Sequence, residues 1–171
     1  MHTLETSPAF QYLASPTYRI KELDSLGNGQ FRYPFDKLPE VLKNLIRKYN
    51  EDEIPVALRT FAEKRGFRIG PVTLGPDLLW INRGNFPTLT PKSRCHVLLA
   101  VSAPIHDGEQ AENTPSKTRL AVQTSGDDSD NVEVDWHIGH IYLLEENEIV
   151  RVLEGGFAFV GIQYATKPVS P

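Results

Sequence analysis

The sequence predicts an α+β fold with two N-terminal amphipathic helices followed by a mainly antiparallel β-sheet. The hydrophobic spacing changes from three and four residues before Gly66 to alternation after it, which indicates helices first and strands second. Residues 95–103 are apolar on both faces, which is typical of a central buried strand. The sheet could be strongly curled or barrel-like, and we expect it to end in a three-stranded meander.

The length of 171 residues and the apolar content of 40% favour a single domain with its own core. We expect that domain to span residues 1–165, with an N-terminal arm at 1–30 and a flexible tail at 166–171. The single cysteine, Cys95, precludes an internal disulfide and favours a reducing, cytoplasmic location. Neither a signal peptide nor a membrane span is expected, because no apolar run is long enough.

Two helices are predicted at residues 37–49 and 53–65. Leu38, Leu42 and Leu45 lie on one stripe of the first helix, and Asp36 is a suitable N-cap. The second helix begins after acidic residues and ends in basic residues and Gly66, which suits the helix dipole and the usual C-terminal glycine.

The strands are predicted from alternation and from turn residues between them. A turn at 145–147 and the pair Gly155-Gly156 separate the last three strands, which form the expected meander. The predicted strands are residues 67–74, 78–82, 95–103, 117–124, 132–144, 148–153 and 157–164, with a further short strand at 18–23 in the arm.

The charges are sorted along the chain. The formal charge is -1 for residues 1–30, +5 for 31–94 and -8 for 95–171, within a total of -4. Much of the acidity lies in expected loops, and such asymmetry affects association with partners more than it affects topology. We therefore expect a soluble, non-catalytic binding or regulatory protein that recognises another macromolecule through charged surfaces. The candidate partner-binding residues are Asp127, Asp128, Asp130, Arg83, Lys92 and Arg94.

A protein is the preferred partner, because acidic loops can receive a basic surface and speed association. Nucleic acid is a weaker alternative, since the two helices resemble a helix-turn-helix only in outline and Glu53 and Glu63 lie within the second. A homodimer, in which the basic helices bind the acidic loops, is a further possibility.

The alternative function is a small-molecule or metal-dependent enzyme. Its candidate catalytic residues lie on the predicted strand 132–144, where Glu133, Asp135 and His137 share one face. A bulge at Gly139 would bring His140 beside His137. The same alternation also describes the solvent face of an edge strand, which is the preferred interpretation. No cofactor and no metal is expected, because phosphate-loop, calcium-loop and nuclease patterns are all incomplete.

Overall fold

The structure is a computed structural model that describes residues 1–16, 18–20, 24–27, 29–81, 85–86, 92–106, 118–124 and 132–169. In chain order, its helical segments are α1 (Pro8–Ala14), the 3-10 turn η1 (Phe35–Lys37), α2 (Glu40–Lys48), the π-helical turn η2 (Tyr49–Glu53) and α3 (Ile54–Arg65). Its strands are β1 (His2–Leu4), β2 (Arg19–Ile20), β3 (Asp24–Gly27), β4 (Gln30–Tyr33), β5 (Phe67–Ile81), β6 (Asn85–Phe86), β7 (Arg94–Val101), β8 (Ile105–His106), β9 (Arg119–Thr124), β10 (Val132–Asp135), β11 (Ile141–Leu144), β12 (Glu148–Glu154) and β13 (Phe157–Pro168).

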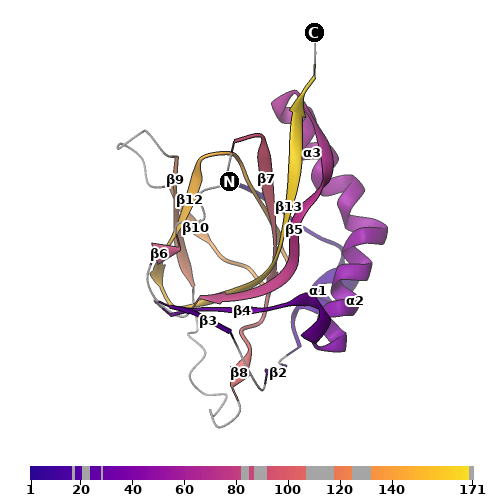
Figure 1. The fold of residues 1–171 in the computed structure, drawn as a ribbon. Helices are drawn as coiled ribbons and strands as arrows, with labels where there is room; N and C mark the ends of the chain where they lie inside the picture. Colours follow the sequence, from indigo (N-terminus) through magenta and orange to yellow (C-terminus); the bar gives the residue numbers. More distant parts are fainter. Residues whose placement is uncertain are drawn as a thin grey trace.

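Two antiparallel sheets face each other, and the helices lie on the outer side of the larger one (Figure 1). The larger sheet has the order β1-β11-β7-β13-β5-β4-β3, and the smaller one has the order β10-β9-β12-β6. The short strands β2 and β8 form a separate parallel pair. β5 and β13 are the longest strands, and their antiparallel pairing extends from Phe157 opposite Ile81 to Pro168 opposite Phe67.

The larger sheet is buried on both faces by two separate clusters of apolar side chains. Along β7, Val97 and Leu99 belong to the cluster under the helices, whereas Leu98 and Ala100 belong to the cluster between the sheets. Successive side chains of a strand point to opposite faces, so one strand contributes to both cores. This explains why residues 95–103 are apolar without alternation, and it confirms a central buried strand at this place in the chain.

The helices α2 and α3 pack on the larger sheet through one apolar stripe each. Their buried side chains are Leu42, Leu45 and Ile46 in α2, and Ala57, Leu58 and Phe61 in α3. Gly66 ends α3 in the left-handed conformation, with φ of 65° and its N–H bonded to the Ala62 carbonyl. A glycine adopts this conformation without steric penalty, so the chain can turn directly into β5.

The α+β class is correct, but the predicted arrangement of its elements is wrong. The described chain has strands β1 to β4 before α2 and a helix α1 inside the expected arm, so two helices do not simply precede the strands. The sheets are open rather than closed into a barrel: the larger ends at β1 and β3, and the smaller at β10 and β6.

The expected meander is also absent from the described strands. β11 pairs with β1 and β7, β12 pairs with β9 and β6, and β13 pairs with β5 and β7. The predicted strand 132–144 is interrupted, with β10 in the smaller sheet and β11 in the larger one. β13 continues to Pro168, so its end includes part of the segment expected to be a tail.

Among the described helices, none has the length and apolar character needed to cross a membrane.

Candidate functional site

A pocket of about 390 Å³ lies at the end of the larger sheet where α3, β5, β7 and β13 meet the β11–β12 turn. Its polar lining comes from distant parts of the chain, namely Arg65, Ser93, Arg94, Glu145, Glu146 and Thr166. A volume of this size falls within the range of roughly 300–1,000 Å³ that is usual for ligand pockets.

Backbone hydrogen bonds hold the walls of the pocket together. The Thr166 N–H donates to the Ser93 carbonyl at 2.8 Å, and the Val169 N–H donates to the Gly66 carbonyl at 2.9 Å. These bonds tie the end of β13 to the residue before β7 and to the end of α3. The pocket therefore rests on regular elements rather than on a single loop, which favours a fixed geometry.

The two glutamates of the pocket are already engaged. Glu145 forms an ion pair with Arg65, and its Oε1 lies 3.0 Å from Nε2 of His2. The Glu146 Oε2 accepts a hydrogen bond of 2.9 Å from the backbone N–H of Ser93. The charge of Glu145 is therefore compensated by Arg65, whereas Glu146 bonds a neutral N–H group and keeps its negative charge.

Three basic side chains next to the pocket form a row across neighbouring strands of the larger sheet. Lys167 lies directly opposite Arg68 in the pairing of β13 with β5, and Arg94 lies opposite Ala165 in the pairing of β13 with β7. Because side chains alternate along a strand, all three emerge on the same face of the larger sheet, the face that turns toward the smaller sheet. We refer to Arg68, Lys167 and Arg94 as the cationic row.

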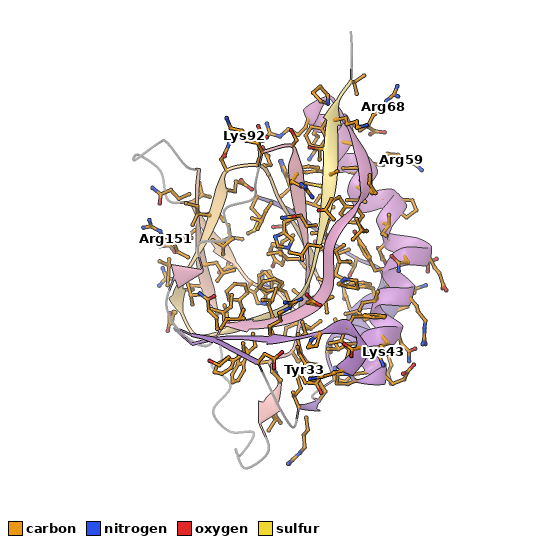
Figure 2. All side chains as sticks on the ribbon, viewed as in Figure 1. Tyr33, Lys43, Arg59, Arg68, Lys92 and Arg151 are labelled. Atoms are coloured by element: carbon orange, nitrogen blue, oxygen red, sulfur yellow. The ribbon has the colours of Figure 1, made fainter. Side chains whose placement is uncertain are left out.

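The cationic row borders the pocket at Arg94, which is half-buried and contributes to the pocket lining. Thr166 and Pro168 also line the pocket, but their side chains point to the face of β13 opposite to Lys167. Arg68 and Lys167 therefore lie outside the pocket. Lys92 is exposed in the turn before β7, and Figure 2 shows it at the same end of the molecule as Arg68. Within the described residues, none of these four cations forms an ion pair.

The structure brings together only some of the predicted partner-binding residues. Arg94 lines the pocket, and Lys92 lies at the same end of the molecule as Arg68 (Figure 2). Arg83, Asp127, Asp128 and Asp130 lie outside the described residues. Sequence reasoning missed Lys167 because it was assigned to a tail beyond the sheet. The sequence carries no periodic signal for this extension, because residues 165–168 do not alternate and all four are at least partly exposed.

The predicted carboxylate–histidine group is divided between an edge strand and a turn. Glu133 is exposed on β10 and accepts a hydrogen bond of 2.5 Å from Arg119, which raises the pKa of that guanidinium. Asp135 is exposed at the end of β10, and the two histidines lie beyond it in the connection to β11. No group of three or more His, Cys, Asp or Glu side chains suited to a metal ion occurs in the described part of the chain.

The rings of His137 and His140 lie side by side, with centroids 5.2 Å apart and planes tilted by 43°. His137 is exposed, whereas His140 is partly buried. Burial lowers the pKa of His140, His137 lowers it further, and the charge of Glu5 acts in the opposite direction. His140 is therefore biased toward the neutral form.

Two other groups with altered pKa values lie in the cores. Burial lowers the pKa of His96 from 6.5 to about 4, and this ring lies on the inter-sheet face of β7 with Leu98. Burial raises the pKa of Cys95 to about 12, and its thiol lies in the cluster under the helices. A buried thiol with a raised pKa is a poor nucleophile, so Cys95 acts as a packing residue.

A comparison with protein-family models gives no match for this chain, and a search of curated proteins finds no relative. The site is therefore defined by its own geometry: a pocket lined by Glu145 and Glu146, bordered by a row of cations that form no ion pair with a described residue, on an α+β scaffold.

Proposed function

We propose that this chain is a binding protein that recognises an acidic segment of a partner protein at the pocket and the cationic row. One observation carries the proposal. Arg68 and Lys167 face each other across β5 and β13, Arg94 lies diagonally from Lys167, and no described acid pairs with any of them. Like charges at directly opposed positions are destabilising, so an anionic ligand would relieve a repulsion that the isolated protein retains.

The chemistry of the site suits carboxylates. The planar guanidinium of Arg94 can hold a carboxylate through paired hydrogen bonds, and its half-buried position strengthens such bonds. Arg68 and Lys167 then contact the next acidic side chains of an extended segment, because the row crosses adjacent strands. Arg94 belongs to the row and also lines the pocket of about 390 Å³, so an uncharged side chain next to the carboxylate at Arg94 can enter the pocket.

A protein partner fits this surface better than nucleic acid. Glu145 and Glu146 line the pocket, so a nucleic-acid strand, which carries a phosphate at every nucleotide, would be repelled there, whereas a peptide can place an uncharged side chain in the pocket. The described helix α3 also buries Ala57, Leu58 and Phe61 against the sheet, so it cannot enter a DNA groove through that side.

Catalysis by Glu133, Asp135, His137 and His140 has weaker support. Glu133 is paired with Arg119 on the exposed edge of the smaller sheet. The two imidazoles lie on a turn outside that strand, and Glu133 is engaged with Arg119 instead of an imidazole, so no carboxylate–histidine pair of the kind needed for general acid–base catalysis is formed by Glu133.

The proposal is tested with a fluorescent Glu-rich peptide, a Lys-rich peptide of equal length and a single-stranded oligonucleotide, each titrated with the protein and followed by anisotropy. We expect the Glu-rich peptide alone to bind in a saturable way. Arg94→Gln and Lys167→Glu should weaken its binding by about tenfold or more, which corresponds to about 1.4 kcal/mol.

The matched control is Lys43→Glu, which makes the same charge change as Lys167→Glu. Lys43 lies on α2 at the other end of the molecule in Figure 2, so this variant should bind the Glu-rich peptide as the unmodified protein does. Equal weakening by both variants would show that only net charge matters, and it would contradict a localised site. Tighter binding of the oligonucleotide than of the peptide would contradict a protein partner.

A further inference from the structure

The connection between β10 and β11 presents two histidines from a rigid turn, and this turn lies outside the acidic-segment site. The His140 N–H donates to the His137 carbonyl at 3.1 Å, which closes the turn. On one side, the His137 N–H donates to the Tyr142 hydroxyl at 2.7 Å, and that hydroxyl donates to the Asp135 carbonyl at 3.0 Å.

The other side of the turn is fixed to β7 and to the N-terminal segment. The Gly139 N–H donates to the Ala100 carbonyl at 2.9 Å, and the Ala100 N–H donates to the His140 carbonyl at 3.0 Å. The Thr6 hydroxyl donates to the Gly139 carbonyl. These bonds hold both histidine backbones in place before any ligand arrives, so a ligand need not order the turn.

Neither imidazole is committed to a hydrogen bond with another described residue. Nδ1 of His140 is buried without a partner among these residues, and none of the hydrogen bonds between described residues involves the ring of His137. A buried Nδ1 leaves no room for an ion beside it, so Nε2 is the nitrogen of His140 that can bind one. Imidazole nitrogen is among the most frequent ligands for zinc and neighbouring transition metals.

The separation of the rings matches the size of such a site. A zinc–nitrogen bond of about 2.1 Å and a ring radius of about 1.1 Å place each ring centroid about 3.2 Å from the ion. Two rings held at a tetrahedral angle are then about 5.2 Å apart, and the centroids of His137 and His140 are separated by 5.2 Å. The nearby charge of Glu5, which acts on His140, adds attraction for a cation.

We propose that His137 and His140 bind a divalent transition-metal ion of the Zn²⁺ type through their two imidazoles. Water completes the coordination, because no third His, Cys, Asp or Glu joins this pair in a metal-binding cluster within the described chain. The site is open, since His137 is exposed. The histidine turn is separate from the pocket, so the metal-binding proposal does not depend on the acidic-segment proposal.

The test is a calorimetric titration of the metal-free protein with Zn²⁺, together with NMR of the histidine ring protons. We expect about one Zn²⁺ per chain, selective shifts of the His137 and His140 ring signals, and affinity lowered about tenfold or more in both His137→Gln and His140→Gln. His2→Gln, which removes a histidine elsewhere, should bind Zn²⁺ as the unmodified protein does.

His137 is exposed, so His137→Gln should fold normally even if His140→Gln does not, and a thermal melt without metal verifies this. The proposal is overturned if Zn²⁺ does not bind, if folded His137→Gln binds it with unchanged affinity, or if the shifted ring signals belong to other histidines.

Discussion

Lys167 lies directly opposite Arg68 where β13 pairs with the beginning of β5. These two cations come from chain segments of opposite net charge, and only the pairing of the last strand with β5 brings them together. Opposed like charges weaken an antiparallel pair, so the sheet end is less stable than a mixed pair would make it. Under the proposed function, a bound acidic segment would relieve this repulsion between Arg68 and Lys167.

Replacing Lys167 with glutamate should separate stability from binding. We expect Lys167→Glu to raise the free energy of unfolding by about 0.2–1 kcal/mol, because an opposite charge then faces Arg68. The same change should weaken binding of the Glu-rich peptide. Urea denaturation and peptide anisotropy measure the two effects, and a variant that loses both stability and binding would contradict the account of the cationic row.

Salt should weaken the complex with the Glu-rich peptide strongly. Arg68 and Lys167 are exposed, and screening becomes effective as the Debye length falls from about 10 Å at 0.1 M salt to about 3 Å at 1 M. Anisotropy titrations across this range should show a steadily rising dissociation constant. An affinity that does not change with salt would indicate that apolar contacts, rather than the cationic row, hold the peptide.

His96 should make the protein less stable in mild acid. Its pKa in the folded protein, about 4, lies below the ordinary value of 6.5, so the unfolded chain binds the proton more tightly. The stabilisation is fully present above pH 6.5 and is lost as the pH falls through 6.5 toward 4. The shift corresponds to a loss on the order of 3 kcal/mol.

Urea denaturation of the unmodified protein and of His96→Gln at several pH values measures this contribution. The two proteins differ only at residue 96, so the difference between the two curves isolates His96. We expect the two proteins to differ in the slope of stability against pH between about pH 6.5 and pH 4. Parallel curves would show that His96 is not buried in the neutral form.

Gly139 and Gly27 provide a matched pair for testing the packing of the histidine turn. Both adopt positive φ, 84° and 85°. A Cβ at residue 139 would lie 2.9 Å from Cα of Gln11, whereas a Cβ at residue 27 meets nothing within 4 Å. We expect Gly27→Ala to destabilise the protein by about 1 kcal/mol through backbone strain, and Gly139→Ala by roughly 1–3 kcal/mol more through overlap with α1. Equal losses in urea denaturation would show that α1 does not pack on the turn.

The sequence patterns that predicted structure correctly are local. The three-to-four spacing of Leu42, Leu45 and Ile46 is sufficient to predict α2, because one helix face must be buried. The two-sided apolar character of residues 95–103 likewise predicted a strand covered on both faces. α1 has only seven residues and two buried side chains, Phe10 and Ala14, so its periodic signal was too short to recognise.

The errors arose where pairing between distant strands decides the structure. β11, β12 and β13 follow one another through short turns, which favours a meander, yet they alternate between two sheets. All four residues of β11 are buried, and such a strand gives no periodicity from which its neighbours could be inferred. The cationic row shares this origin, since Lys167 joins Arg68 and Arg94 only through the register of β13.

The most direct test of the account is NMR mapping of backbone amide shifts as the Glu-rich peptide is added. We predict that the largest shifts cluster at the pocket and the cationic row, around Ser93, Arg94, Glu146, Thr166 and Lys167, and that Arg94→Gln reduces them. Shifts centred instead on α2, or on the strand that carries Glu133 and Asp135, would contradict recognition of an acidic segment at this end of the sheet.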